Sequence, residues 1–269
     1  MTDTSSPDIV LRELTEQGVL RLTLNDNGRR NALSEAMIDL LAQEMNESAV
    51  DEKVRTIVVA AKGPAFCAGH DLKEMTAART MADHGRDYFA MLMGKCASLM
   101  QSIVNNPKPV IAEVAGVATA AGCQLVASCD LAYAADTARF GTPGVNIGLF
   151  CSTPMVALSR NVSNKMAMEM LLCGDLIDSQ RAADIGLVNQ VINGSDLSEH
   201  TMKLAEKIAG KSTMTIAIGK QAFYEQRQMS LEQAYEYASR VMVDNMLKYD
   251  AEEGIQAFIE KRQAKWSDK

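Results

Sequence analysis

Short apolar runs alternate with stretches of helical periodicity along most of this chain, and no other sequence feature limits the possible folds as strongly. The runs TIVVAA (56–61) and VIAEV (110–114) are nearly continuous, which is typical of strands buried on both faces. Before the first run, Ser34 can cap a helix on which Met37, Leu41 and Met45 share one face. This alternation predicts α/β architecture.

Further segments extend the pattern on both sides. Residues 9–14 and 19–24 predict an opening β-hairpin around a turn at Gln17 and Gly18. The other expected elements are a glycine-containing turn at 62–71, a helix beginning near Ala121, a strand at 131–135, a Gly- and Pro-rich loop at 141–148 and a strand near 187–192.

No strand pattern survives after about residue 198, where amphipathic helices are expected. Apolar residues recur there at helical spacing, among them Leu231, Ala234, Tyr235, Ala238 and Val241. These helices carry more apolar surface than one helix pair could bury, so we expect them to pack on neighbouring subunits. We therefore divide the chain into a core that holds the site, residues 1–197, and a helical oligomerisation region, residues 198–269.

The charge balance excludes a nucleic-acid-binding protein. The 269 residues hold 27 Lys and Arg against 34 Asp and Glu, a net charge of -7, so no overall positive field attracts a polyanion. Any bound phosphate must be met by a local basic cluster. The most apolar stretch, 109–135, is interrupted by Glu113, Gln124 and Asp130, which indicates a buried core segment and no membrane span.

Cysteine and histidine usage argues against disulfides and metal. The six cysteines form no C-x-x-C pair, which favours buried thiols in a reducing compartment. The three histidines are too dispersed for a metal site, so no metal is expected: His70, His84 and His200. The first ten residues lack the basic and apolar regions of a targeting segment, and we therefore expect a cytoplasmic location.

Two glycine-bearing junctions remain as candidate sites: FCAGHDL (66–72) and GVATAAGCQ (116–124). Small residues at a strand-to-helix junction let the backbone approach a ligand, and a helix N-terminus leaves amides unpaired. Each loop alone is compatible with an ordinary tight turn. If two such amides converge, they form an oxyanion hole.

Four segments carry a family resemblance. RNALS (30–34), the FCAGHDL loop, the AAGCQL run that ends at Asp130, and the EG…F…KR pattern of 253–262 resemble the crotonase (enoyl-CoA hydratase/isomerase) superfamily over about residues 18–266. Two further segments, 122–130 and 142–154, resemble one subgroup of it. The resemblance implies repeated β-β-α units with two sheets, and a C-terminal helical region that forms trimers or dimers of trimers. It also implies a lyase or isomerase that takes an acyl-CoA thioester as substrate and needs no separate cofactor.

The resemblance also assigns site residues. It implies that the backbone amides of His70 and Ala121 bind the thioester oxygen while an enolate forms, and that the Ala68 carbonyl meets the adenine. The other CoA-binding positions that it implies are Arg30, Ala32, Lys73, Phe258 and Lys261. A solvated helix face is the simpler interpretation of Lys73 and Lys261.

The sequence departs from the family at the two positions that carry catalytic glutamates in its hydratases. Gln124 stands at the first and Gly144 at the second. Neither side chain exchanges a proton at neutral pH, and each general acid or base contributes about 10²- to 10⁴-fold. We therefore expect the oxyanion hole to be retained and efficient hydration to be lost.

Three alternatives stay open. Thr142-Pro143 and the VNIG segment (145–148), beside a Gly-His-Asp loop, resemble the decarboxylase branch of the superfamily, although Cys151 stands where that branch has a tyrosine. Decarboxylation needs mainly enolate stabilisation. The second alternative is a non-catalytic acyl-CoA-binding protein, and the third is a structural oligomer without ligand. The His70 ring is a candidate replacement for the missing carboxylates.

Four polar residues near these loops have simpler expected roles. We expect Asp71 to cap the helix after its loop. Asp130 is expected to form a turn, and Glu113 to pair at the surface or at a subunit interface. We expect Cys151 to be an inert packing residue.

Overall fold

Two largely parallel sheets form the centre of the computed structural model, which describes residues 8–268. The six-stranded sheet has the order β1 (Val10–Leu14), β2 (Val19–Leu24), β3 (Thr56–Ala61), β5 (Val110–Val114), β7 (Leu131–Ala135) and β10 (Gln190–Ile192). The β1–β2 pair in it is antiparallel, and all other neighbouring strands in it are parallel. The four-stranded sheet has the order β4 (Ala65–Cys67), β6 (Val117–Thr119), β8 (Arg139–Gly141) and β9 (Ile177–Asp178).

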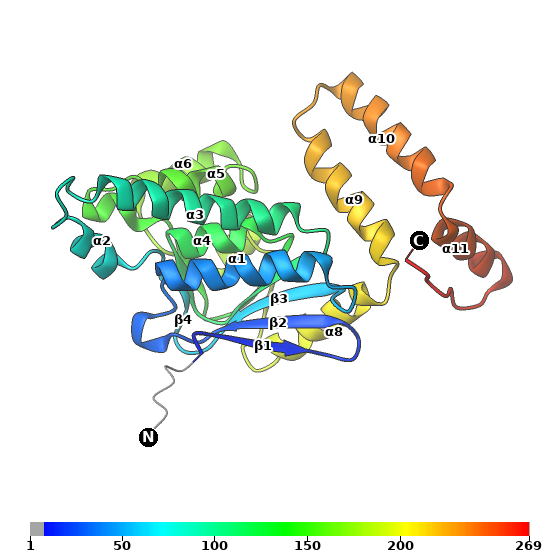
Figure 1. Cartoon of the computed structure of the whole chain (residues 1–269), viewed down its shortest axis with the longest axis horizontal. Coiled ribbons are helices and arrows are strands. Elements are labelled where there is room, and N and C mark those ends of the chain that lie inside the picture. Colours follow the sequence, from blue (N-terminus) through cyan, green and yellow to red (C-terminus); the bar gives the residue numbers. More distant parts are fainter. Residues whose placement is uncertain (1–7, 269) are drawn as a thin grey trace.

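Helices cover both faces of the larger sheet (Figure 1). The helices that precede the last strand in the chain are α1 (Glu35–Val50), α2 (Leu72–Ala78), α3 (Arg86–Asn105), α4 (Ala121–Ser128), α5 (Ser152–Leu158), α6 (Asn164–Cys173) and α7 (Ser179–Asp184). The C-terminal helices are α8 (Leu197–Ala209), α9 (Thr213–Gln226), α10 (Leu231–Met246) and α11 (Tyr249–Glu260). Two short 3-10 helices, η1 (Asn27–Arg29) and η2 (Pro143–Ile147), complete the fold.

The α/β prediction is confirmed, and so are the longer elements. The strands expected at 19–24, 56–61, 110–114 and 131–135 have those bounds in the structure. The opening hairpin is antiparallel, with Leu14 opposite Leu20. Ser34 caps α1, since its hydroxyl accepts a hydrogen bond from the Met37 amide at 3.2 Å. The periodicity was informative because each of these elements is long enough to show it.

The smaller sheet was expected only from the family resemblance. Its strands have two or three residues each, too short to display an alternation of apolar and polar positions. The segment expected as a turn at 62–71 holds β4, whose three residues are all buried. The loop at 141–148 holds the end of β8 and the helix η2.

The C-terminal helices divide into two groups. Helix α8 packs on the larger sheet, where Leu197, Ala205 and Ala209 contact Val19, Val58 and Ile111 in one buried cluster. Helices α9, α10 and α11 extend away from the sheets as an arm (Figure 1). The predicted boundary at 197/198 stays a prediction.

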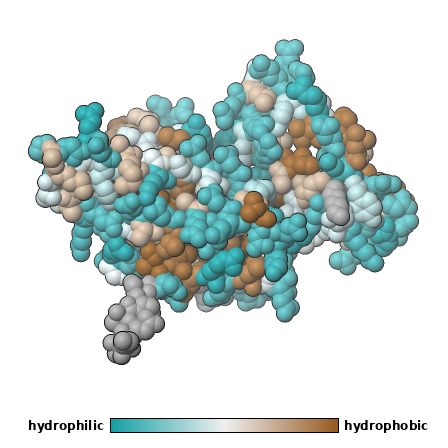
Figure 2. Space-filling model, in the orientation of Figure 1, coloured by the Kyte–Doolittle hydropathy of each residue, from teal (hydrophilic) through white to brown (hydrophobic). Residues whose placement is uncertain are grey.

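The arm exposes large apolar side chains. Leu231 is 76% exposed, Leu247 80% and Phe258 86%. Figure 2 shows hydrophobic atoms gathered on this part of the surface. Within residues 8–268 no helix combines the length and the hydrophobicity that a membrane crossing requires. An exposed apolar surface of this kind is typical of a subunit contact.

A buried polar cluster attaches the arm to the core through Asp130, which lies in the expected bend before β7. The Asp130 carboxylate accepts hydrogen bonds from Lys220 Nζ at 2.7 Å, from the Tyr224 hydroxyl at 2.9 Å and from the Val110 amide at 2.7 Å. Lys220 Nζ also donates to the carbonyls of Ile103 and Lys108. Burial raises the pKa of Tyr224 and lowers that of Lys220, while the adjacent Asp130 charge favours the ammonium form and opposes the shift at Lys220.

Glu113 also differs from its expected place. Its carboxylate is buried and forms a bidentate ion pair with Arg21, with distances of 2.8 and 2.6 Å. The pair joins β2 and β5 inside one chain, so the expected pairing forms but the expected surface position is wrong, and a subunit-interface position stays a prediction. Glu113 can occupy this buried strand position because the Arg21 guanidinium lies beside its carboxylate and neutralises the charge.

Removing one member of the Asp130 cluster should destabilise the fold strongly. The side chains of Lys220 and Asp130 are 8% and 16% exposed, so Lys220→Met or Asp130→Asn leaves the other partner as a buried charge without its counter-charge. We expect each to lower the free energy of unfolding by about 3–5 kcal/mol, measured by urea denaturation. The double variant should cost less than the sum of the two.

The exposed pair Arg240–Glu236 on α10 provides the matched control. Its side chains are 64% and 66% exposed, so Arg240→Met should change the free energy of unfolding by less than about 1 kcal/mol. Equal effects at the two sites would contradict the role assigned to the buried cluster.

Candidate active site

Two loops from the smaller sheet meet at the candidate site. Strands β4 and β6 pair in parallel, so the loops that follow them leave the same edge of the sheet. The first loop contains Gly69 with a φ of +91°, and a Cβ there would lie 3.0 Å from the Ala120 Cβ and 3.4 Å from the Ala121 nitrogen. Only glycine fits both this left-handed backbone and this close approach.

A second glycine sets how closely α4 approaches β4. A Cβ on Gly122 would collide with the carbonyl oxygen of Cys67. Ala120, just before the helix, has φ 50° and ψ -119°, a conformation that non-glycine residues rarely adopt. Strain of this kind is concentrated at functional sites. The packing therefore fixes the start of α4 against the first loop.

The amides of His70 and Ala121 are unpaired at this meeting point. Ala121 is the first residue of α4, so its amide has no acceptor within the helix. Across the described part of the chain, neither amide donates a hydrogen bond, whereas the neighbouring Ala120 amide donates to the Gly141 carbonyl at 2.9 Å. Two free donors on abutting loops can bind one anionic oxygen.

The His70 ring anchors its loop. Its Nδ1 lies 3.3 Å from the Leu33 carbonyl oxygen, and the Leu33 amide donates to the Gly69 carbonyl at 2.8 Å. Burial lowers the pKa of the ring, which makes it neutral at pH 7, with the Nδ1 proton donated to Leu33. The other nitrogen, Nε2, is buried and has no partner among residues 8–268. A proton-transfer role for the ring stays a prediction.

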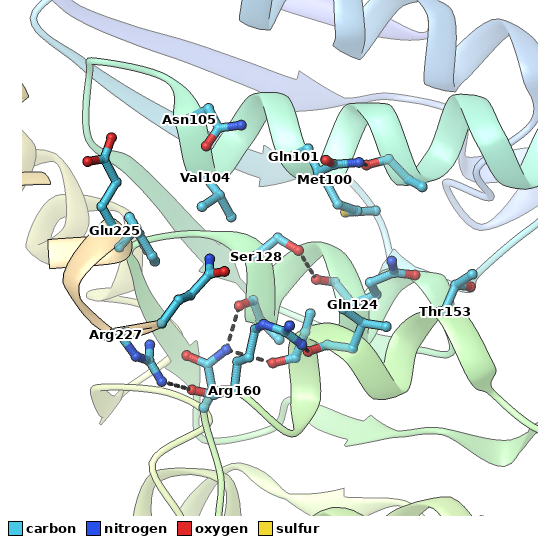
Figure 3. A pocket seen from close by; sticks show the side chains of 17 residues that line it. Met100, Gln101, Val104, Asn105, Gln124, Ser128, Thr153, Arg160, Glu225 and Arg227 are labelled. Carbon is cyan, nitrogen blue, oxygen red and sulfur yellow. Dashed lines mark hydrogen bonds between the residues drawn. The ribbon is translucent and has the colours of Figure 1, made fainter. Parts of the chain in front are cut away.

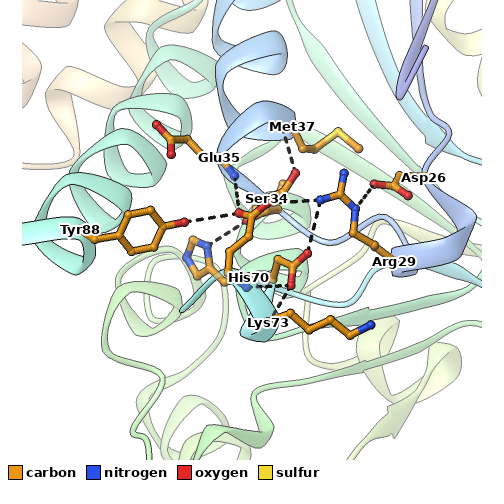
Figure 4. A network of polar contacts seen from close by, with 11 residues as sticks. Asp26, Arg29, Ser34, Glu35, Met37, His70, Lys73 and Tyr88 are labelled. Atoms are coloured by element: carbon orange, nitrogen blue, oxygen red, sulfur yellow. Dashed lines mark hydrogen bonds and ion pairs between the residues drawn. The ribbon is translucent and has the colours of Figure 1, made fainter. Parts of the chain in front are cut away.

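Figure 4 shows the polar network that holds this loop from outside. Asp71 caps α2 as expected, because its carboxylate accepts from the Lys73 and Glu74 amides. Arg29 bridges Asp26 at 2.6 Å and Glu74 at 3.3 Å. Sequence reasoning missed the contribution of Arg29 and Glu74, since exposed charges near a helix start give no distinctive pattern.

The predicted CoA-binding positions fall into two groups. Arg30, Ala32, Ala68 and Lys73 lie around the first loop, where the Ala68 amide donates to the Arg30 carbonyl at 3.2 Å. Ala32 is buried, whereas the side chains of Arg30 and Lys73 are exposed. Phe258 and Lys261 lie at the end of α11, at the opposite end of the molecule from α2 (Figure 1). One chain does not bring the two groups together.

Neither glutamate position holds a group that transfers protons. Gln124 lies one turn into α4, is 5% exposed, and its Oε1 has no hydrogen-bond partner within residues 8–268. Gly144 is the one buried residue of η2, and a Cβ there would lie 2.6 Å from the Leu149 carbonyl oxygen and 2.8 Å from Cys151 Sγ. Burial raises the pKa of Cys151, which keeps the thiol protonated and agrees with a packing role.

A cavity of about 730 Å³ opens beside Gln124, between α3, α4, α5 and α9 (Figure 3). Its walls combine apolar and polar side chains: Ala97, Met100, Gln101, Val104, Asn105, Gln124, Ala127, Ser128, Thr153, Val156, Ala157, Arg160, Asn161, Tyr224, Glu225, Arg227 and Gln228. Sequence reasoning did not find it, because α9 lies about one hundred residues from α4 in the chain. Within residues 8–268 no group of three or more His, Cys, Asp or Glu side chains is suited to hold a metal ion.

Comparisons with known proteins agree with this geometry. A family model described as enoyl-CoA hydratase/isomerase matches residues 14–269. The mouse protein named enoyl-CoA hydratase domain-containing protein 3, mitochondrial, is 47% identical over 252 residues, which cover 94% of this chain and 82% of the mouse protein. This is the subgroup that segments 122–130 and 142–154 predict, and the prediction is confirmed.

Solved structures confirm the predicted crotonase-type fold. The crystal structure of human enoyl-CoA hydratase domain-containing protein 3 superposes with a TM-score of 0.91 at 44% identity, over 96% of this chain and all of that one. An enoyl-CoA hydratase of Mycobacterium smegmatis superposes with the same TM-score at 47% identity, over 96% of this chain and 98% of that one.

The expected cytoplasmic location is wrong by these comparisons, because the relatives from mouse, rat, human and Xenopus laevis are all named mitochondrial. The expectation rested on the composition of residues 1–10, of which the structure describes only the last three. The composition of a short terminal stretch shows only whether that stretch is a targeting segment. It carries no other information on the compartment.

Sequence match and structural similarity each extend over almost the whole chain. The chain belongs to the enoyl-CoA hydratase/isomerase, or crotonase, family.

Proposed function

We propose that the protein acts on an acyl-CoA thioester and stabilises the enolate that forms from it. The observation that carries this proposal is the pair of unpaired amides at His70 and Ala121. Negative charge develops on the thioester oxygen as the enolate forms, and two fixed amide donors stabilise it more than water would. Removing one such donor from a comparable site costs about 3 kcal/mol.

The reaction that fits the site best needs little help from a base. Gln124 and Gly144 offer no proton-transfer group, so hydration or isomerisation lacks its usual carboxylates. In decarboxylation the bond between Cα and a carboxylate breaks, CO₂ leaves, and the electron pair forms the enolate, which water then protonates at Cα. Enolate stabilisation is the main requirement of this step. Decarboxylation is therefore the first alternative within the family activity, and ligand binding without turnover is the second.

The CoA part of the ligand would need two copies of the chain. Arg30, Ala32, Ala68 and Lys73 would lie along it in one subunit. Phe258 and Lys261 lie at the far end of the same subunit, so they would have to be supplied by a neighbour. The exposed apolar arm supports such an assembly, and we propose a trimer or a dimer of trimers.

A panel of CoA thioesters tests the activity. We expect at least one among enoyl-, malonyl- and methylmalonyl-CoA to be converted, as measured by mass spectrometry. Ala121→Pro should lower kcat by about 10²- to 10³-fold, because proline removes the amide donor. Proline is tolerated at the first position of a helix, which is where Ala121 lies. Ala120 before it has φ 50° and ψ -119° and would have to become extended, so folding of this variant is checked first by circular dichroism.

Asn164→Pro is the matched control, since Asn164 is the exposed first residue of α6 and Ser163 before it is already extended. It should keep full activity. If Ala121→Pro does not fold, Gly69→Ala crowds the same amide from the other loop. Binding of thioesters without any turnover would leave the non-catalytic alternative, and no binding at all would reject the proposal.

Position 144 should not accept a larger residue. Gly144→Ala places a methyl group against the Leu149 carbonyl and the Cys151 sulfur, so we expect a loss of about 1–3 kcal/mol in the free energy of unfolding. Gly94→Ala is the control, because a Cβ there meets nothing within 4 Å and alanine favours the helix. For the same reason Gly144→Glu, even combined with Gln124→Glu, should not restore hydration. A stable, hydrating double variant would show that the loop adapts and that this packing argument is wrong.

Assembly should depend on the apolar arm. We expect sedimentation to show a particle of three or six chains, and Leu247→Asp on the arm to dissociate it and weaken CoA binding. Val50→Asp is the control, since Val50 is 82% exposed at the end of α1, outside the arm. A wild-type monomer that binds CoA would contradict the shared site.

A further inference from the structure

The cavity beside Gln124 is basic at one end, although the protein as a whole is acidic. Its lining includes only three charged side chains, Arg160, Arg227 and Glu225. The chain carries a net charge of -7, so a cavity with two arginines and one glutamate differs from the acidic character of the whole protein. A cavity lined by one sign of charge concentrates ligands of the opposite sign.

Both arginines keep free hydrogen-bond donors. Arg227 Nη2 donates to the Arg160 carbonyl at 2.6 Å, and Arg160 Nη1 donates to the Val156 carbonyl at 2.9 Å. A guanidinium group has five N–H donors, so most of them stay available. Across residues 8–268 neither arginine forms an ion pair with an acidic side chain.

Glu225 does not neutralise this end. Its carboxylate accepts from Gln221 Nε2 at 2.7 Å and from the Tyr237 hydroxyl of α10, and these bonds lower its pKa. Figure 3 shows the side chains of Glu225 and Arg227 directed to different sides of the cavity. The acid is therefore satisfied by α9 and α10, while the guanidinium groups lack a carboxylate.

The cavity lies beside the proposed reaction site. Gln124 in its wall lies three residues after Ala121 on α4, and Figure 3 shows Gln124 and Thr153 at one end of the cavity with Arg227 at the other. Along α3 the lining runs from Ala97 to Asn105, a rise of about 12 Å at 1.5 Å per residue. Met100, Val104 and Val156 supply apolar surface to the wall, beside polar side chains such as Gln101 and Asn105.

We propose that this cavity takes an acyl chain that ends in a carboxylate, with Arg160 and Arg227 binding the distal carboxylate. The inference rests on the proposed function, since it places the thioester at the amides and the chain beside Gln124. The apolar part of the wall fits methylene groups. The arginines supply charge-assisted hydrogen bonds at the far end, where a methyl-terminated chain would leave them unpaired.

Two saturated thioesters of equal carbon number test the proposal without turnover. We expect adipyl-CoA to bind the full-length protein about tenfold more tightly than hexanoyl-CoA in calorimetry at low salt. The preference should shrink as salt is added, because part of it is electrostatic at an open cavity. The double variant Arg160→Gln, Arg227→Gln should bring the two affinities to within about twofold of each other by weakening adipyl-CoA alone.

Arg12→Gln is the control variant, because Arg12 is an exposed arginine on β1 whose only ion-pair partner in the described chain is Glu44. It should keep the preference. If the double variant does not fold, Arg227→Lys keeps a charge but loses the planar donor set, and it should reduce the preference only in part.

The possible results separate the two proposals. If neither thioester binds, the proposed function fails and this inference fails with it. If hexanoyl-CoA binds as tightly as adipyl-CoA, the inference is overturned while the function stands. If adipyl-CoA is preferred equally by the double variant, the carboxylate is bound elsewhere and the assignment of the two arginines is wrong.

Discussion

The approach of two backbone segments without intervening side chains is the constraint on which the site depends. Gly122 lets α4 lie against the Cys67 carbonyl, and Gly69 lets the first loop turn beside Ala120. A methyl group at either position would push the loops apart. The unpaired amides of His70 and Ala121 stand close together only because these glycines are there, and the polar network around Arg29 and Asp71 keeps the first loop in place.

The larger sheet could be predicted from sequence, and the smaller one could not. Residues 56–61 and 110–114 are long, apolar and bounded by polar segments, so their pattern survives in a single sequence. Strand β9 has two residues, and β4 and β6 have three each. Such strands are defined by the neighbours they pair with and not by their own composition, so they could be expected only from the resemblance to a family.

The candidate site was predictable where it depends on the backbone and unpredictable where it depends on distant side chains. The amide donors follow from glycine-bearing junctions that the sequence displays. The buried cluster at Asp130 was missed because Lys220 and Tyr224 lie about ninety residues away in the chain. At Gly144 the sequence revealed the missing carboxylate, but only the structure shows that Leu149 and Cys151 take up the space. Arg160 and Arg227 follow α5 and α9, and only the tertiary fold brings them to one cavity, which no local pattern encodes.

Helix α9 lines the cavity and also begins the apolar arm, which has a consequence for cooperativity. It contributes Tyr224 to the cavity wall, ends just before Arg227, and is also the root of the apolar arm. The Lys220 ion pair attaches α9 to the core. In the proposed assembly, a ligand that shifts α9 would alter the subunit contact, and association would alter ligand affinity by the same factor, because thermodynamic linkage is reciprocal. The proposed sites within one assembly would then communicate through a single helix and not through a separate regulatory domain.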